Sequence, residues 1–144
     1  MLLGFKARFV PMIEDGSKTH TIRAKRKIRP RVGETCHCYT GLRQKGARLL
    51  GRWPCVKVEE ITIRLRCRPE DFFPLALDIW IDGERLSPDE VNDLAWRDGF
   101  RPVRRCDAWI VMCHYWLENH GINRLSPRRG TLAFEGDVIY WRRP

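Results

Sequence analysis

The stretch Ile61-Thr62-Ile63-Arg64-Leu65-Arg66-Cys67-Arg68 alternates apolar and polar residues along its whole length. Successive side chains of a strand point to opposite faces of a sheet, so the apolar residues would share one face and the three arginines the other. This period of two is typical of a strand with one buried face. We therefore predict a long strand over roughly residues 52–68.

Shorter strands are predicted on both sides of this one. They are expected at Leu2 to Lys6, Lys18 to Lys25, Glu34 to Thr40, in a pair around Asp82-Gly83, and at Thr131 to Trp141, where a strand or a hairpin would fit. An Asp-Gly dipeptide favours the tight turn of a hairpin. A helical turn over residues 9–14 would end at Asp15-Gly16, a second turn signal.

Two helices are predicted late in the chain. Ser87 to Glu90 combines a capping serine, a proline at the first helical position and a glutamate three residues after the cap. Gly99 is a plausible stop for this helix. A second helix, from about Cys106 to Asn119, is apolar almost all round and should be buried against a sheet. Many strands with two late helices predict one α+β, barrel-like domain covering residues 1–144.

Charge is distributed unevenly along the 144 residues, whose net charge is +9. Residues 1–57 hold 14 basic and 3 acidic side chains (net +11), whereas residues 58–144 hold 13 basic and 15 acidic ones (net −2). Such an asymmetry points to a polyanionic partner, most often a nucleic acid. A basic surface that only improves solubility is the alternative.

Several classes of protein are not expected. The longest stretch without a charge, Ala108 to Leu117, is far shorter than the roughly 20 residues that cross a bilayer. Lys6 and Arg8 interrupt the apolar start before a signal-peptide core can develop, so we expect a cytoplasmic protein without a membrane partner. The six cysteines include no CxxC pair and are expected to be buried and reduced, with no metal and no cofactor.

The N-terminal part of the chain resembles the ASCH domain family. The resemblance lies in four short stretches: Phe5 to Phe9, Asp15 to Arg23, Val32-Gly33-Glu34 and Tyr39-Thr40-Gly41. Leu94 to Phe100, followed by an aromatic-rich helix, is also similar to that family. The resemblance is specific over about residues 2–66, weaker over 87–141 and essentially absent in 69–86.

The resemblance implies a PUA-like fold, a small closed β-barrel with two or three flanking helices. It implies a cleft lined by residues 16–23 that recognises RNA or a modified nucleoside. Some members of the family are amidohydrolases that deacylate N4-acetylcytidine with a lysine, a threonine and a glutamate, and ribonuclease activity is proposed for others. Binding, amide hydrolysis and RNA cleavage are therefore the three functional hypotheses, in that order.

Carried over to this chain, the family's lysine and threonine fall on Lys18 and Thr21. The family's glutamate falls on Asp98, whose carboxylate lies closer to the backbone by one methylene, about 1.5 Å. A further arginine of the motif falls on Arg23. The resemblance thus implies Lys18, Thr21 and Asp98 as catalytic residues. The expected ligand-binding residues are Arg8, Lys18, His20, Thr21, Arg23 and Tyr39.

The chemistry of these residue types sets a condition on their geometry. A threonine hydroxyl is a weak nucleophile until a base such as a neutral lysine removes its proton. Lys18 and Thr21 are three residues apart and would face opposite ways in a perfect strand, so Lys18 must sit in the turn after Gly16 for the two to converge. Asp98 would then hold Lys18 or activate water. Alternatively, Lys18 is a solvated turn lysine and Thr21 an ordinary cross-strand threonine.

Basic side chains outside this site are candidates for contacts with a phosphate backbone. They are Lys25, Arg26, Lys27, Arg29, Arg31, Arg43, Lys45, Arg64 and Arg66. The expected partner is RNA or a nucleoside-like small molecule, and the expected state is a monomer or a weak homodimer.

Overall fold

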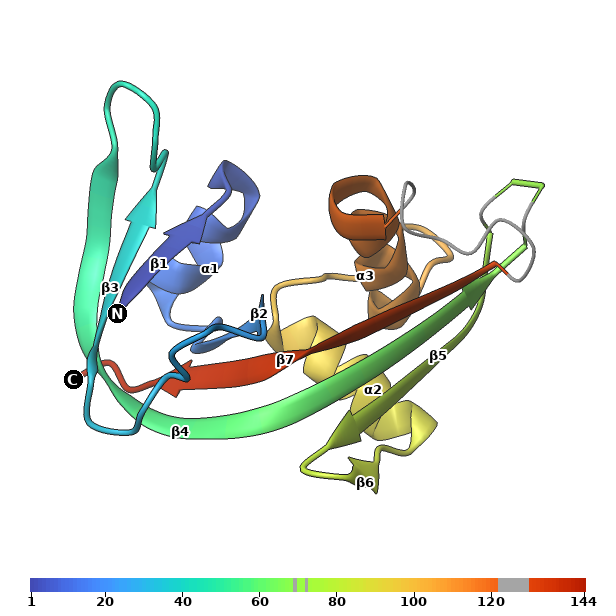
Figure 1. Ribbon diagram of the computed structural model, residues 1–144. Helices are drawn as coiled ribbons and strands as arrows, with labels where there is room; N and C mark the ends of the chain where they lie inside the picture. Colours follow the sequence, from blue (N-terminus) through green and yellow to red (C-terminus); the bar gives the residue numbers. More distant parts are fainter. Residues whose placement is uncertain (69, 72, 122–129) are drawn as a thin grey trace. The chain divides into compact units, whose positions relative to one another are not determined.

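The computed structural model describes residues 1–68, 70–71, 73–121 and 130–144, which form an α+β protein with three α-helices and a mixed sheet of seven strands (Figure 1). The strands are β1 (Leu2–Phe5), β2 (His20–Ala24), β3 (Thr35–Thr40), β4 (Arg48–Cys67), β5 (Pro74–Ile81), β6 (Glu84–Arg85) and β7 (Thr131–Trp141). The helices are α1 (Val10–Asp15), α2 (Pro88–Arg97) and α3 (Ala108–Trp116).

The chain divides into two compact units. Unit 1 contains Met1–Glu59, Arg97–Gly99 and Asp137–Pro144, and unit 2 contains Glu60–Trp96 and Phe100–Gly136. Strands β4 and β7 each contribute residues to both units. The helices are short, and no described helix is long and apolar enough to span a bilayer.

The predicted closure of the strands into a barrel is wrong for the described residues. Strand pairing follows the order β1-β3-β4-β5-β6, and β7 joins β2 to β4, so this path does not return to its start. In unit 1 the Gly4 carbonyl of β1 accepts a hydrogen bond at 2.6 Å from the guanidinium of Arg23 on β2.

The core of unit 1 is built on β1 and β3, which pair in parallel and lie side by side in Figure 1. Leu3 and Phe5 alternate inward on β1, and Cys36 and Cys38 do so on β3. Burial raises the pKa of both thiols to about 12, so they remain protonated and pack as small apolar groups. This packing confirms the predicted burial of these two cysteines.

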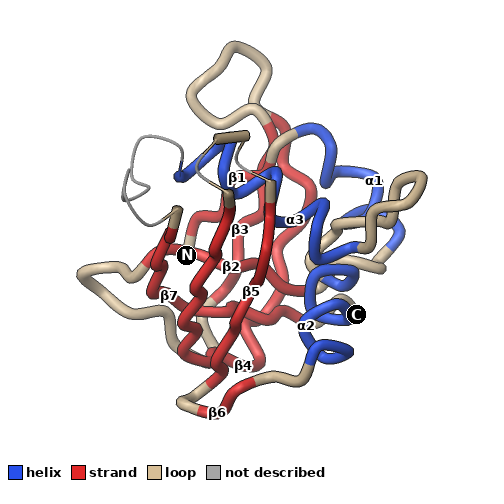
Figure 2. Tube along the Cα trace, turned by 90° about the vertical axis from the view of Figure 1, so that its right-hand side faces the viewer, coloured by secondary structure: helices blue, strands red, loops and turns tan. Residues whose placement is uncertain are grey.

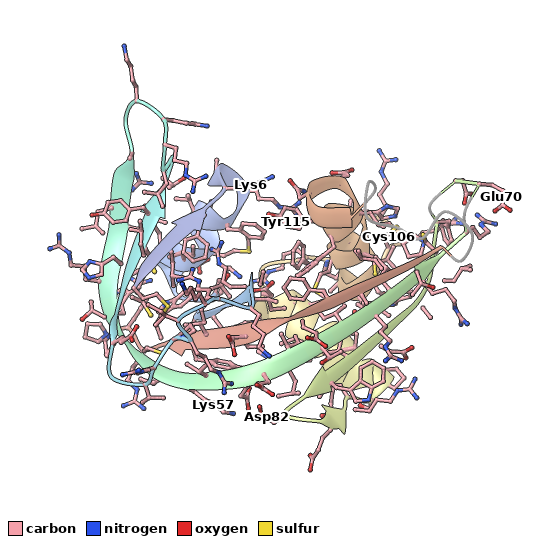
Figure 3. The ribbon with its side chains drawn as sticks, in the orientation of Figure 1. Lys6, Lys57, Glu70, Asp82, Cys106 and Tyr115 are labelled. Carbon is pink, nitrogen blue, oxygen red and sulfur yellow. The ribbon has the colours of Figure 1, made fainter. Side chains whose placement is uncertain are left out.

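The alternation that predicted the long strand is confirmed in unit 2. Ile61, Ile63, Leu65 and Cys67 are buried on one face of β4, whereas Arg64 and Arg66 are exposed on the other, and Arg68, directly after the strand, is exposed too. β5 pairs antiparallel with this part of β4 and returns to β6 through Asp82 and Gly83, both with positive φ (47° and 84°). Figure 3 labels Asp82 at this turn. The Asp-Gly signal therefore forms the predicted hairpin.

Both predicted helices are present. Ser87 Oγ accepts from the Glu90 amide and Glu90 Oε1 accepts from the Ser87 amide, each at 3.2 Å, so the predicted capping box begins α2. α3 lies above α2 in Figures 1 and 2, and Asn92 of α2 accepts a hydrogen bond from the Trp109 amide in the first turn of α3. A single π-helical turn, Leu117–Gly121, follows α3.

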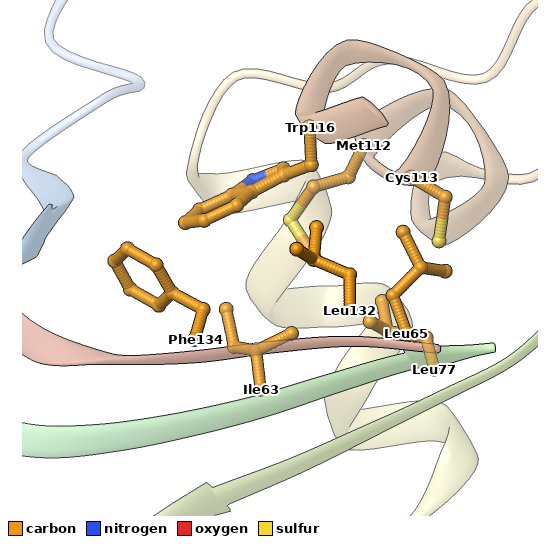
Figure 4. A pocket seen from close by; sticks show the side chains of 8 residues that line it. All are labelled: Ile63, Leu65, Leu77, Met112, Cys113, Trp116, Leu132 and Phe134. Atoms are coloured by element: carbon orange, nitrogen blue, oxygen red, sulfur yellow. The ribbon is translucent and has the colours of Figure 1, made fainter. Parts of the chain in front are cut away.

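The apolar side of α3 closes an apolar pocket in unit 2. Figure 4 shows Met112, Cys113 and Trp116 of α3 facing side chains of β4, β5 and β7. The Trp116 ring meets that of Phe134 edge-on at 4.5 Å between centroids.

β7 itself is one continuous strand rather than a hairpin at residues 135–137, and Val138 and Ile139 on it are fully buried.

Candidate functional site

Lys18 reaches the interior of unit 1 through the turn that ends α1. Gly16 takes a left-handed conformation (φ 85°) at the helix end, and Asp15 Oδ1 accepts a hydrogen bond from the Ser17 amide at 2.7 Å. The Lys18 amide then donates to the Met12 carbonyl at 2.9 Å. Lys18 therefore precedes β2 and lies in the turn, which is the position that convergence with Thr21 requires.

The ammonium group of Lys18 is bonded to Asp98, eighty residues further along the chain. Lys18 Nζ donates to Asp98 Oδ1 and, at 2.5 Å, to the Asp98 backbone carbonyl. Both residues are buried, with Lys18 2% and Asp98 6% exposed. Lys18 Nζ also lies 5.1 Å from the centre of the Phe9 ring, a cation–π contact. The structure therefore joins two of the three predicted catalytic residues.

Gly99, directly after Asp98, lies close to the ring of Phe9, the residue before α1. Its φ of +102° is a conformation that side chains with a Cβ rarely adopt, and an added Cβ would lie 2.9 Å from Cδ1 of Phe9. The predicted stop of α2 is thus also a point of close approach. Glycine at this position lets the chain turn directly after Asp98.

His20, the first residue of β2, faces the same carboxylate. Its Nε2 lies 3.6 Å from Asp98 Oδ1 and, among the described residues, has no hydrogen-bond partner. Burial, and then the positive charges of Lys18 and Arg97, lower the pKa of His20 well below its usual 6.5. His20 is therefore a neutral imidazole at pH 7.

A series of side-chain contacts leads from His20 through Tyr140 and Glu59 to the exposed Lys57. The His20 ring lies 5.2 Å from that of Tyr140, whose hydroxyl donates to Glu59 Oε2 at 2.7 Å. Glu59 also pairs with the exposed Lys57, labelled on β4 in Figure 3. Burial, together with the acceptor Glu59, raises the pKa of Tyr140 and keeps its hydroxyl protonated.

The carboxyl group of Asp98 is itself perturbed. Burial raises its pKa, against the opposing effect of Lys18 and Arg23. Thr21 is also buried, at 5% exposure, and follows His20 directly on β2. Three titratable groups of unit 1, Lys18, His20 and Asp98, are thus buried together, and we call them, with the neighbouring Thr21, the Lys18 cluster.

The other predicted ligand-binding residues differ in their contacts. Arg23 is half-buried and lies over the Phe5 ring, 5.1 Å from its centre. Arg8 is exposed and lies 5.3 Å from the centre of the Phe9 ring, on a neighbour of the cluster. Tyr39 is half-buried on β3 opposite Gly4, and no described hydrogen bond or ring contact joins it to Lys18 or Asp98.

The basic residues predicted to contact nucleic acid are all exposed, but one of them is held by an acid. Arg29 Nε donates to Asp137 Oδ1 at 3.0 Å, and Asp137 is buried at 3% exposure. Arg29 therefore anchors the segment between β2 and β3 instead of presenting a free charge. The remaining candidates divide between the units, with Lys25, Arg26, Lys27, Arg31, Arg43 and Lys45 in unit 1 and Arg64 and Arg66 in unit 2.

Sequence reasoning missed the residues that surround the cluster. Phe9 and Tyr140 carry no signal by themselves, because aromatic residues near strand and helix ends are ordinary core residues. The dipeptide Asp98-Gly99 did carry a sequence signal. A glycine that ends a helix allows a sharp turn, and this turn fixes the position of the acid directly before it. No described group of three or more histidine, cysteine or acidic side chains is arranged to hold a metal ion.

Comparison with known proteins gives this chain no relative. Neither protein-family models, nor curated proteins, nor solved structures matched it. The resemblance to the ASCH family therefore stays a prediction that rests on the quoted residues.

Proposed function

We propose that unit 1 binds a modified nucleoside, free or within RNA, at the Lys18 cluster. The observation that carries the proposal is the buried ion pair of Lys18 and Asp98 beside the neutral His20. Removing two charges from water costs several kcal/mol, and apolar replacements of such pairs are often as stable or more so. Strongly perturbed titratable groups gather at functional sites more than elsewhere.

The cluster offers the groups that an acylated cytosine requires. Asp98 supplies acceptor oxygens, Lys18 supplies N–H donors, and His20 Nε2 is either an acceptor or a donor, depending on its tautomer. A base with one exocyclic N–H and carbonyl oxygens has matching partners for each of these groups. Positive charge on residues 1–57 favours a ligand that carries phosphate, as a nucleotide within RNA does.

Calorimetric titration with N4-acetylcytidine tests this proposal. We expect saturable binding by the wild type, weaker binding of unmodified cytidine, and loss of binding in Lys18→Met. Lys6→Met is the matched control, because Lys6 is an exposed lysine of the same unit. Absence of binding by the wild type, or equal binding by Lys18→Met, would contradict the proposal.

Amide hydrolysis at the same cluster is the second candidate, favoured by the contact of Lys18 with a carboxyl group of raised pKa. When Asp98 takes the proton, Lys18 becomes a neutral amine that can accept the Thr21 hydroxyl proton. Thr21 Oγ then attacks the acetyl carbonyl carbon, and Lys18 returns the proton to the departing exocyclic nitrogen. Water hydrolyses the acetyl-threonine ester and releases acetate, restoring the hydroxyl.

The ultraviolet absorbance of N4-acetylcytidine separates hydrolysis from binding. Hydrolysis predicts a spectrum that changes to that of cytidine with the wild type and stays unchanged with Thr21→Val. Asp98→Glu restores the reach of the family's glutamate and should maintain or raise the rate. Binding without any spectral change would leave the site as a recognition site alone.

A further inference from the structure

The outer face of the sheet in unit 2 concentrates arginine side chains around one tryptophan. The face consists of Thr62, Arg64 and Arg66 on β4, Ala76, Asp78 and Trp80 on β5, and Arg85 on β6, with Arg68 directly after β4. We call it the arginine face. The opposite face of the same strands holds the buried Ile61, Ile63, Leu65 and Ile79, so the arginine face is the solvent side.

Trp80 holds two of these arginines in place. The guanidinium of Arg64 lies 5.3 Å and that of Arg85 5.9 Å from the centre of the Trp80 ring. In the sheet register Trp80 is opposite Thr62 on one side and Arg85 on the other, so the two arginines approach from both neighbouring strands. A stacked guanidinium loses less conformational freedom when it binds an anion.

Acidic side chains neutralise only part of this face. Arg85 donates to Asp78 at 2.5 Å, and Arg68 donates twice to Asp71, at 3.1 and 2.7 Å. Arg66 is opposite the small Ala76, and no ion pair of it occurs among the described residues. Arg64 is opposite Asp78, but that carboxylate already accepts from Arg85, so Arg64 and Arg66 carry the positive excess. They lie about 7 Å apart along the strand, because side chains on one face recur every second residue.

We propose that the arginine face binds the phosphate backbone of a single-stranded nucleic acid. The fork of a guanidinium matches two oxygens of a phosphate, and two such forks in a row match successive phosphates. Trp80 is half-buried, so part of its ring is open for a base to stack, which a single strand permits and a duplex does not. The proposal is independent of the Lys18 cluster, whose residues all belong to unit 1.

Fluorescence anisotropy of a labelled oligouridine of about ten nucleotides, measured at several salt concentrations, tests the proposal. Each phosphate contact contributes about −0.7 to the slope of log affinity against log salt for a single strand. We expect Arg64→Ala and Arg66→Ala each to make the slope shallower by about 0.7. Trp80→Leu should weaken binding about 5- to 150-fold with little change of slope, because it removes base stacking and no charge.

Two further variants sharpen the test. Arg64→Lys keeps the charge but loses the planar fork, so it should weaken binding while the slope stays near that of the wild type. Arg101→Ala is the matched control, because Arg101 is an arginine of unit 2 that stacks on a different tryptophan, Trp96, at 3.6 Å. It should leave both affinity and slope unchanged.

The proposal is overturned if Arg64→Ala and Arg66→Ala leave the salt slope unchanged. Equal affinity for an oligoglutamate of the same charge would also overturn it, because the face would then bind any polyanion rather than a nucleic acid. Repeating the titration with Lys18→Met separates this site from the proposed nucleoside site. Unchanged oligouridine binding by that variant is expected here, whatever happens to N4-acetylcytidine.

Discussion

Lys18 donates hydrogen bonds to both the side chain and the backbone carbonyl of Asp98, in the interior of unit 1. This one contact joins the turn after α1 to the end of α2. The ion pair between the ammonium and the carboxylate offsets the free-energy cost of burying the two charges. The stability of the fold and the chemistry proposed for the cluster therefore depend on the same pair.

Breaking this pair from either side should be costly. Lys18→Met leaves a buried carboxylate and Asp98→Asn leaves a buried ammonium, and we expect each to lower the free energy of unfolding by about 3 kcal/mol. The double variant should lose much less than the sum, because neither charge then remains. Urea unfolding of the three variants measures this coupling, and strictly additive losses would show that the pair does not interact as the structure indicates.

His20 should make unit 1 sensitive to mild acid. Its pKa is lowered in the folded state, so below pH 6.5 the unfolded chain binds a proton that the folded chain does not. The free energy of unfolding should therefore decrease as the pH falls below 6.5, by at most about 1.4 kcal/mol per pH unit. His20→Gln should flatten this part of the profile.

The control for the histidine prediction is His114, which is exposed on α3. Thermal unfolding between about pH 5 and pH 8 should show the same profile for His114→Gln as for the wild type. A wild-type profile that is flat below pH 6.5, or one that His20→Gln leaves unchanged, would contradict the buried neutral imidazole.

Gly99→Ala tests the close approach of Gly99 to the Phe9 ring. The new methyl group would meet the Phe9 ring and would also occupy a left-handed backbone conformation, so we expect a loss of about 2–3 kcal/mol. Gly46→Ala isolates the backbone contribution, because Gly46 has a similar φ of +90° and nothing within 4 Å of an added Cβ. Equal losses in the two variants would mean that the contact with Phe9 is unimportant.

Most elements were predictable because their signals are local. The alternation of residues 61–68, the Asp-Gly turn and the capping box around Ser87 each depend on neighbours within a few residues. The open sheet was not predictable in this way. The pairing of β1 with β3 and of β2 with β7 joins residues far apart in the sequence, so no local pattern indicates it.

For the candidate site, too, the local features could be predicted from the sequence and the long-range contacts could not. Spacing alone indicated that Lys18 had to lie in the turn after Gly16, and the family resemblance indicated Asp98 as its partner. The role of His20 could not be predicted, because a histidine in an alternating strand packs inward for many reasons. Its importance appears only when Asp98, from a distant helix end, is found 3.6 Å from its ring nitrogen.

Arg29 and Lys27 should respond differently although both are exposed basic residues of one segment. Arg29→Ala leaves the buried Asp137 without its described partner, so we expect a loss of roughly 1–3 kcal/mol in the free energy of unfolding. Lys27→Ala should stay within about 0.5 kcal/mol of the wild type. Chemical denaturation measures both, and a neutral Arg29→Ala would return Arg29 to the group of free surface charges.

The most direct test of the nucleoside site is a titration of the isotope-labelled protein with N4-acetylcytidine, followed by the amide resonances of the backbone. Binding at the Lys18 cluster predicts saturable shifts confined to the amides of residues 18–23 and 98–99 and their neighbours in unit 1, with the amides of Arg64 and Arg66 unmoved. Lys18→Met should abolish these shifts. Saturable shifts that leave residues 18–23 and 98–99 unaffected, or no shifts at millimolar ligand, would contradict the proposed site.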